Sequence, residues 1–193
     1  MAVKHSSEMA NLCTTVVQVA KPFLEEIAKL SKETGFEYGL AIERDENNKP
    51  IVETFYSPKE QVKGLDRRYF YSLEMGETTM ATVHTHPGDI EPYLSFGDLV
   101  GAMDHEVDTI CILTPKTMRL SCWSGIEELR QKLLEIDKYV PPEDALDSVL
   151  NVLMKEHGIK RRKSREYPEL KPIFDDWLIG TDEIKKCSVR VKE

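Results

Sequence analysis

A pair of histidines two residues apart places the strongest constraint on how this chain can fold. His84-Thr85-His86-Pro87 is followed, seven residues later, by Ser95-Phe96-Gly97-Asp98. Residues i and i+2 of a strand point to the same face, so His84 and His86 can reach one metal ion together. Pro87 ends the strand, and Ser95 can cap a helix whose first turn carries Asp98. The pattern therefore predicts a strand and a helix start that meet at a metal site.

The residue types in this pattern indicate which metal the site holds. Three protein ligands and an open fourth position are typical of a catalytic zinc ion, whereas structural zinc sites use four ligands. Two histidines at this spacing also arise by chance in a chain with 5 histidines. A metal site is the better explanation because the ligand types, the strand-ending proline and the helix-capping serine agree with one another. We therefore expect one Zn²⁺ ion held by His84, His86 and Asp98.

The same residues resemble the JAMM motif of the MPN (JAB) domain family of zinc metalloproteases. That motif has an upstream glutamate, His-x-His-Pro, a short loop and Ser-x-x-Asp. His84, His86 and Asp98 match its zinc ligands, and Ser95 matches its serine. The loop before Ser95 is one residue longer than the commonest family spacing. The resemblance covers about residues 13–125 and implies an MPN-like fold and peptidase activity for that part.

The resemblance also implies a glutamate that acts as acid and base, for which the chain offers two positions. Glu37 stands at the head of an expected strand, but Glu37-Tyr38-Gly39-Leu40 is one residue shorter than the family's Glu-x-x-Gly-Leu. Glu33, in Glu33-Thr34-Gly35, matches some prokaryotic relatives and is expected in a last helical turn that faces solvent. We expect Glu37 to take a proton from the attacking water and give it to the leaving amine. Ser95 is expected to cap its helix and also to stabilise the oxyanion.

The hydrophobic pattern predicts an α/β (α+β) chain with an MPN-like mixed β-sheet flanked by helices. The first eight residues are expected to be a loose terminus. Strands are expected at 15–19, 37–43, 51–56, 69–73, 78–84, 108–113 and 118–123, and helices at 21–32 and 95–105. After residue 125 we expect helices at 126–139, at 143–157 and near Trp177, and a last strand at 187–191. This predicts a hydrolase core over residues 1–125 and a mainly helical C-terminal extension over residues 126–193.

Composition bears on the cellular setting and on the partners. The 40% of apolar and 31% of charged residues are ordinary for a soluble globular protein, and the net charge of −8 argues against nucleic-acid binding. No apolar run approaches the ~20 residues of a membrane helix. The four cysteines are widely spaced, so we expect free thiols in a cytoplasmic protein. A cross-strand disulfide between Cys111 and Cys122 is the alternative.

Three functions are compatible with these residues. The resemblance implies an isopeptidase that removes a ubiquitin-like protein from a conjugate, and some prokaryotic relatives process other peptide conjugates. The second hypothesis is an MPN-type scaffold, although scaffolds of the family lack the ligand set that this chain has. The third is a zinc amidohydrolase with a different small-protein or peptide substrate. Residues 126–193 are the expected surface for a homodimer contact or a protein partner.

Overall fold

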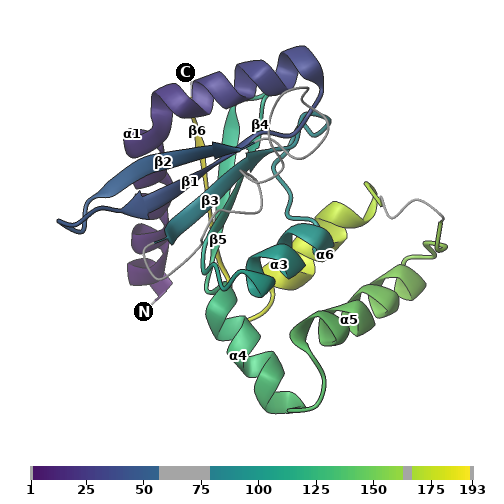
Figure 1. The fold of residues 1–193 in the computed structure, drawn as a ribbon. Helices are drawn as coiled ribbons and strands as arrows, with labels where there is room; N and C mark the ends of the chain where they lie inside the picture. Colours follow the sequence, from purple (N-terminus) through teal and green to yellow (C-terminus); the bar gives the residue numbers. More distant parts are fainter. Residues whose placement is uncertain (1, 57–78, 163–166, 192–193) are drawn as a thin grey trace.

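The computed structural model describes residues 2–56, 79–162 and 167–191, and these form a sheet with helices on both faces (Figure 1). The expected mixed sheet flanked by helices is confirmed. The strand expected at 69–73 lies outside the described residues. The described helices are α1 (Ala2–Thr34), α3 (Phe96–Asp104), α4 (Ile126–Ile136), α5 (Pro142–Glu156) and α6 (Leu170–Ile179). The described strands are β1 (Gly39–Arg44), β2 (Pro50–Tyr56), β3 (Thr79–Thr85), β4 (Ile110–Thr114), β5 (Arg119–Ser124) and β6 (Lys185–Arg190).

These strands form one sheet in the order β2-β1-β3-β4-β5-β6. β3 and β4 are parallel, and the other neighbouring pairs are antiparallel. A parallel pair needs a crossover connection, and the segment containing α3 supplies it. The last strand, β6, belongs to residues 126–193, which were expected to form an extension outside the core, so that segment completes the sheet.

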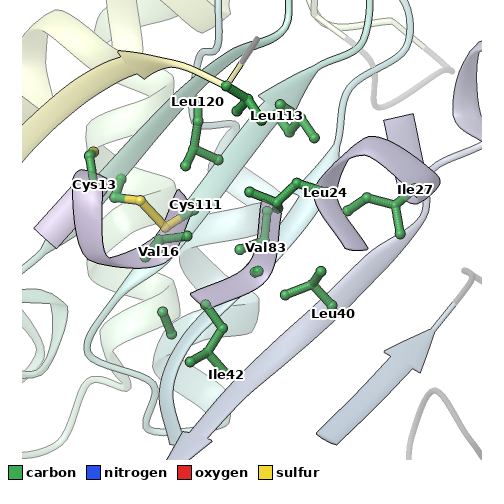
Figure 2. Close-up of a cluster of buried hydrophobic side chains, with 14 of the residues drawn as sticks. Cys13, Val16, Leu24, Ile27, Leu40, Ile42, Val83, Cys111, Leu113 and Leu120 are labelled. Atoms are coloured by element: carbon green, nitrogen blue, oxygen red, sulfur yellow. A yellow bond between two sulfur atoms is a disulfide. The ribbon is translucent and has the colours of Figure 1, made fainter. Parts of the chain in front are cut away.

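The two faces of the sheet are covered by different helices. α1 lies along one face, while α3 to α6 gather on the other (Figure 1). Under α1, the side chains of Val16, Leu24 and Ile27 pack against Leu40 and Val83 of the sheet (Figure 2). The second core joins the opposite face to α3, α4, α5 and α6, with Trp123 and Phe174 among its largest fully buried side chains. Each face therefore has its own apolar core.

The N-terminal segment differs from what its composition predicts. The strand expected at 15–19 and the loose terminus are both wrong, because residues 2–34 form one helix. The strand expectation rested on β-branched residues, whose lower helix propensity costs less than about 1 kcal/mol per residue. Packing outweighs that preference, because the residues that face the sheet recur every three or four positions: Cys13, Val16, Ala20, Leu24 and Ile27.

Pro22 was expected to open a helix and instead lies inside α1, at an exposed position. A proline there removes one backbone hydrogen bond, and the helix persists because buried residues anchor it on both sides of Pro22. The helix ends at Gly35, which has a φ of 73° and whose N–H donates to the Ser31 carbonyl. A left-handed glycine is a common way to end a helix.

The other expected elements within the described residues are present with shifted ends. The β4–β5 hairpin places Cys111 opposite Cys122, as predicted. The expectation of free thiols is wrong, because the structure joins Cys111 to Cys122 and Cys13 to Cys187 by disulfides. The second pair is 174 residues apart in sequence, and only the packing of α1 near β6 brings it together. Disulfides persist mainly in oxidising compartments, so the cysteines give no support to a cytoplasmic location.

None of the helices in the described part of the chain has both the length and the apolar composition that crossing a membrane requires.

Candidate metal centre

Three side chains from β3, the residue after it and α3 point their polar atoms at one place. His84 Nε2 lies 3.0 Å from Asp98 Oδ1 and 3.1 Å from His86 Nε2. His86 Nε2 lies 3.1 Å from Asp98 Oδ2. His86 is 4% exposed, while His84 and Asp98 are 12% and 16% exposed, so solvent reaches the group through His84 and Asp98. The structure thus brings together the three residues that the motif predicts as ligands.

The alternation of side chains along β3 puts both histidines on the face away from α1. Thr85, between them, points the other way: its hydroxyl donates to Ser31 Oγ of α1 at 2.8 Å and accepts from the Tyr38 N–H at 2.9 Å. The His86 N–H donates to the Leu113 carbonyl of β4 at 3.0 Å. The backbone N–H of His86 is therefore held by β4 and the preceding side chain by α1 and Tyr38, which limits where the His86 ring can lie.

The start of α3 positions the third ligand. Ser95 is the N-cap: its Oγ accepts from the Asp98 N–H at 3.1 Å, and the Ser95 N–H donates to Asp98 Oδ2 at 3.1 Å. This reciprocal pair is a capping box, and it confirms the cap expected at Ser95. A carboxylate in the first turn is also favoured by the helix dipole. The Asp98 carboxylate therefore holds the helix start and faces both histidines.

The donor set fits a divalent metal ion. Ligand atoms 2.0–2.1 Å from a tetrahedral ion lie about 3.3–3.4 Å apart, close to the observed separations of 3.0 and 3.1 Å. Two Nε2 atoms this close cannot both donate to each other, whereas both can coordinate a shared cation. Two imidazoles and one carboxylate suit zinc and several other first-row metals. His84, His86 and Asp98 can therefore bind a metal ion.

An aspartate outside the motif orients one of the histidines. His86 Nδ1 lies 3.1 Å from Asp89 Oδ2, and Lys171 Nζ donates to the same oxygen at 2.9 Å. When Nδ1 donates to a carboxylate, Nε2 is the nitrogen left for a metal, which is a common arrangement around metal-binding histidines. The sequence motif does not include Asp89. Its place just after the Pro87-Gly88 turn is the one local signal that could have indicated it.

The charges in the site favour a cation next to Asp98. Burial lowers the pKa of His86, but hydrogen bonds to Asp89 and Asp98 and the charges of Asp98 and Glu37 outweigh it and raise the pKa to about 9. For Asp98, burial raises the pKa, yet the His84 charge and the hydrogen bonds from both histidines hold it well below its usual range. Positive charge is therefore stabilised where the three side chains meet, and a bound cation meets the same requirement.

Of the two candidate glutamates, Glu37 borders the three ligands. Its Oε1 lies 3.9 Å from His86 Nε2, and its side chain is 47% exposed. It occupies the short connection between α1 and β1. Glu33 lies exposed in the last turn of α1, as expected. Glu37 is therefore close to the candidate ligand atoms and accessible to solvent.

The sequence was also compared with protein families and with curated proteins. No family model and no curated protein matches it. Any assignment of function therefore depends on the motif residues and on their arrangement in space.

Proposed function

We propose that this protein is a zinc-dependent metallopeptidase of the JAMM type that hydrolyses an isopeptide or peptide bond. The substrate class we propose is a conjugate of a ubiquitin-like protein. The observation that carries the proposal is the convergence of His84, His86 and Asp98 with the half-exposed carboxylate of Glu37 beside them. The MPN-like character of the fold is part of the proposal, supported by a mixed sheet whose parallel pair is connected through the ligand-bearing helix.

The proposed mechanism assigns a separate task to each side chain. Zinc, when bound, supplies a Lewis acid that polarises a carbonyl and lowers the pKa of water to about 7. The Glu37 carboxylate would take the proton of the attacking water and return it to the leaving amine. The Ser95 oxygen accepts the Asp98 N–H, and its own proton remains available to donate to the oxyanion. Asp89 would hold the His86 ring in the orientation that presents Nε2.

A scaffold role is the competing hypothesis. The complete ligand set and the ordering contact from Asp89 argue against it, because a cluster of two histidines and two carboxylates is costly to bury when it has no task. An amidohydrolase with a different peptide substrate would use the same site and would differ only in specificity.

The test combines metal analysis with a substrate panel. Purified protein should contain one zinc ion per chain in the site and cleave at least one member of a panel of isopeptide-linked and linear conjugates of ubiquitin and ubiquitin-like proteins. His84→Ala should lose both that zinc ion and the cleavage. The exposed His105→Ala serves as the matched histidine control and should keep both. Zinc-loaded wild-type protein that cleaves no peptide or isopeptide conjugate would contradict the proposal.

A further inference from the structure

All four cysteines of the chain meet at one place between α1 and the sheet. Cys111, Cys122 and Cys187 are cross-strand partners on β4, β5 and β6, so their side chains share the face that α1 covers. Cys13 reaches the same place from α1 (Figure 2). Three of the four are fully buried, and Cys187 is 8% exposed. The sheet register and the helix together therefore build one sulfur cluster, on the opposite face of the sheet from the histidines.

The sulfur atoms of this cluster lie closer together than the two disulfides require. The Sγ atoms of Cys13, Cys122 and Cys187 all lie within 4.8 Å of one another, although Cys122 is joined to Cys111 and not to either of the others. Thiolates 2.3 Å from a tetrahedral zinc ion are about 3.8 Å apart. One ion can therefore bridge these three sulfurs with small side-chain movements.

The cysteine cluster lies in an apolar environment, which affects the charge that its reduced thiols can carry. The cysteines belong to the apolar core that joins α1 to the sheet, among side chains such as Val16 and Leu120. An apolar environment disfavours a bare thiolate, and a bound metal removes that penalty by neutralising the sulfur charge. Thiolate ligands select zinc, copper(I) and similar thiophilic ions over magnesium or calcium.

We propose that the reduced protein binds one thiophilic metal ion through the thiolates of Cys13, Cys122 and Cys187, and that the two disulfides are the oxidised form of this second site. A dithiol reductant supplies two electrons and two protons to each disulfide and becomes a disulfide itself. Metal binding then displaces one proton from each of the three thiols. The Cys111 thiol stays beside the site without coordinating. In either form the cluster ties α1 to the strands at the β6 edge.

Cobalt(II) distinguishes this site from the histidine site, because only cobalt bound to thiolates gives intense sulfur-to-metal charge-transfer absorption. The experiment uses the His84→Ala chain, reduced with a dithiol that is then removed without air. We expect one equivalent of cobalt to produce the charge-transfer band in the reduced protein and no band in the oxidised protein. Cys122→Ser removes one of the three Co–S bonds and should therefore lower the intensity of the band, and the matched Cys111→Ser should keep it.

Two results would overturn the second site. One is a reduced, folded protein, with four titratable thiols and an unchanged circular dichroism spectrum, that shows no charge-transfer band. The other is a band of undiminished intensity in Cys122→Ser. The first measurement needs no change at any cysteine, so it decides the matter even if a cysteine variant fails to fold.

Discussion

Asp89 joins Lys171 to His86 of the candidate metal centre through a single carboxylate oxygen. Oδ2 lies 3.1 Å from His86 Nδ1 and 2.9 Å from Lys171 Nζ. Lys171 belongs to α6, so a residue from the C-terminal part of the chain helps to fix the ring of His86, which directly follows β3. Burial raises the Asp89 pKa, but the hydrogen bonds and charges of His86 and Lys171 together outweigh it and lower the pKa below its usual value. This keeps Asp89 ionised as an acceptor.

Removing this carboxylate should weaken metal binding without unfolding the protein. We expect Asp89→Ala to lower zinc affinity about 10–100-fold, the usual effect of losing a partner that orients a ligand. Lys171→Met should have a smaller effect in the same direction, because it disturbs only the position of Asp89. Competition with a chromophoric chelator measures the affinity, and Asp104→Ala, at an exposed position of α3, is the control. Wild-type affinity in Asp89→Ala would show that the contact does not orient His86.

Ser95 allows the cap and the proposed chemistry to be separated. Ser95→Ala should lower the free energy of unfolding by about 1 kcal/mol, because the Asp98 N–H loses its acceptor. It should keep zinc and, under the proposed function, reduce kcat about 10²–10³-fold through loss of an oxyanion donor. Chemical denaturation, metal analysis and steady-state kinetics measure the three effects. If kcat is unchanged while the protein loses stability, the Ser95 hydroxyl acts only as a helix cap.

The two glutamates give a matched pair for the acid/base role. Glu37→Gln should keep bound zinc but reduce hydrolysis about 10²–10⁴-fold, the range for loss of a general acid/base. Glu33→Gln changes the same chemical group at an exposed site on α1 and should behave like wild type. Single-turnover cleavage with zinc-loaded protein is the measurement. The opposite ranking of the two variants would move the acid/base assignment to Glu33.

The residues of the site differ in how far the sequence can predict them. The convergence of His84, His86 and Asp98 follows from local rules, namely alternation along β3 and the capping box at the start of α3. Asp89 and Lys171 are 82 residues apart, and nothing local to either residue indicates that they meet. The pairing of Cys13 with Cys187 is non-local in the same way.

The main error in the fold has a related cause. The segment 15–19 has strand-like composition, and the sheet beneath it makes it helical by burying Val16 and Ala20. Elements whose signals are local, such as the β4–β5 hairpin around residues 115–117, agree with the structure. Residues 15–19 of α1 depend on tertiary contacts, and their prediction as a strand was wrong. The differences in helix propensity between residues are small compared with the free energy gained by burying an apolar helix face.

The two disulfides should differ in their contribution to stability in the oxidised protein. Cys13–Cys187 closes a loop of 174 residues and Cys111–Cys122 one of 11 residues, so chain-entropy estimates give about 5 and about 3 kcal/mol. The Cys13→Ser/Cys187→Ser chain should therefore unfold at lower denaturant concentration than the Cys111→Ser/Cys122→Ser chain. Equilibrium denaturation with and without a reductant measures this. If the two variants have equal denaturation midpoints under oxidising conditions, the stabilisation from each disulfide does not depend on the length of the loop it closes.

Asp175 should make the free energy of unfolding depend on pH in the acidic range. It is 2% exposed and accepts hydrogen bonds from Trp123 Nε1 at 2.6 Å and Lys186 Nζ at 2.8 Å. Burial raises its pKa above the usual range, although the Lys186 and Trp123 contacts oppose this. The unfolded carboxyl loses its proton near pH 4 and the folded one at higher pH. The native state therefore binds more protons between these two pKa values, and the free energy of unfolding falls as pH rises through that interval.

Asp175→Asn removes this titration while leaving an oxygen to accept the Trp123 N–H. The difference in unfolding free energy, wild type minus variant, should therefore decrease as pH rises from about 4, by at most about 1.4 kcal/mol per pH unit, and become constant above the folded pKa. Urea denaturation followed by tryptophan fluorescence at a series of pH values measures it, with the exposed Asp104→Asn as control. A difference that grows with pH instead would mean that the Lys186 contact outweighs burial and that the folded pKa is lowered.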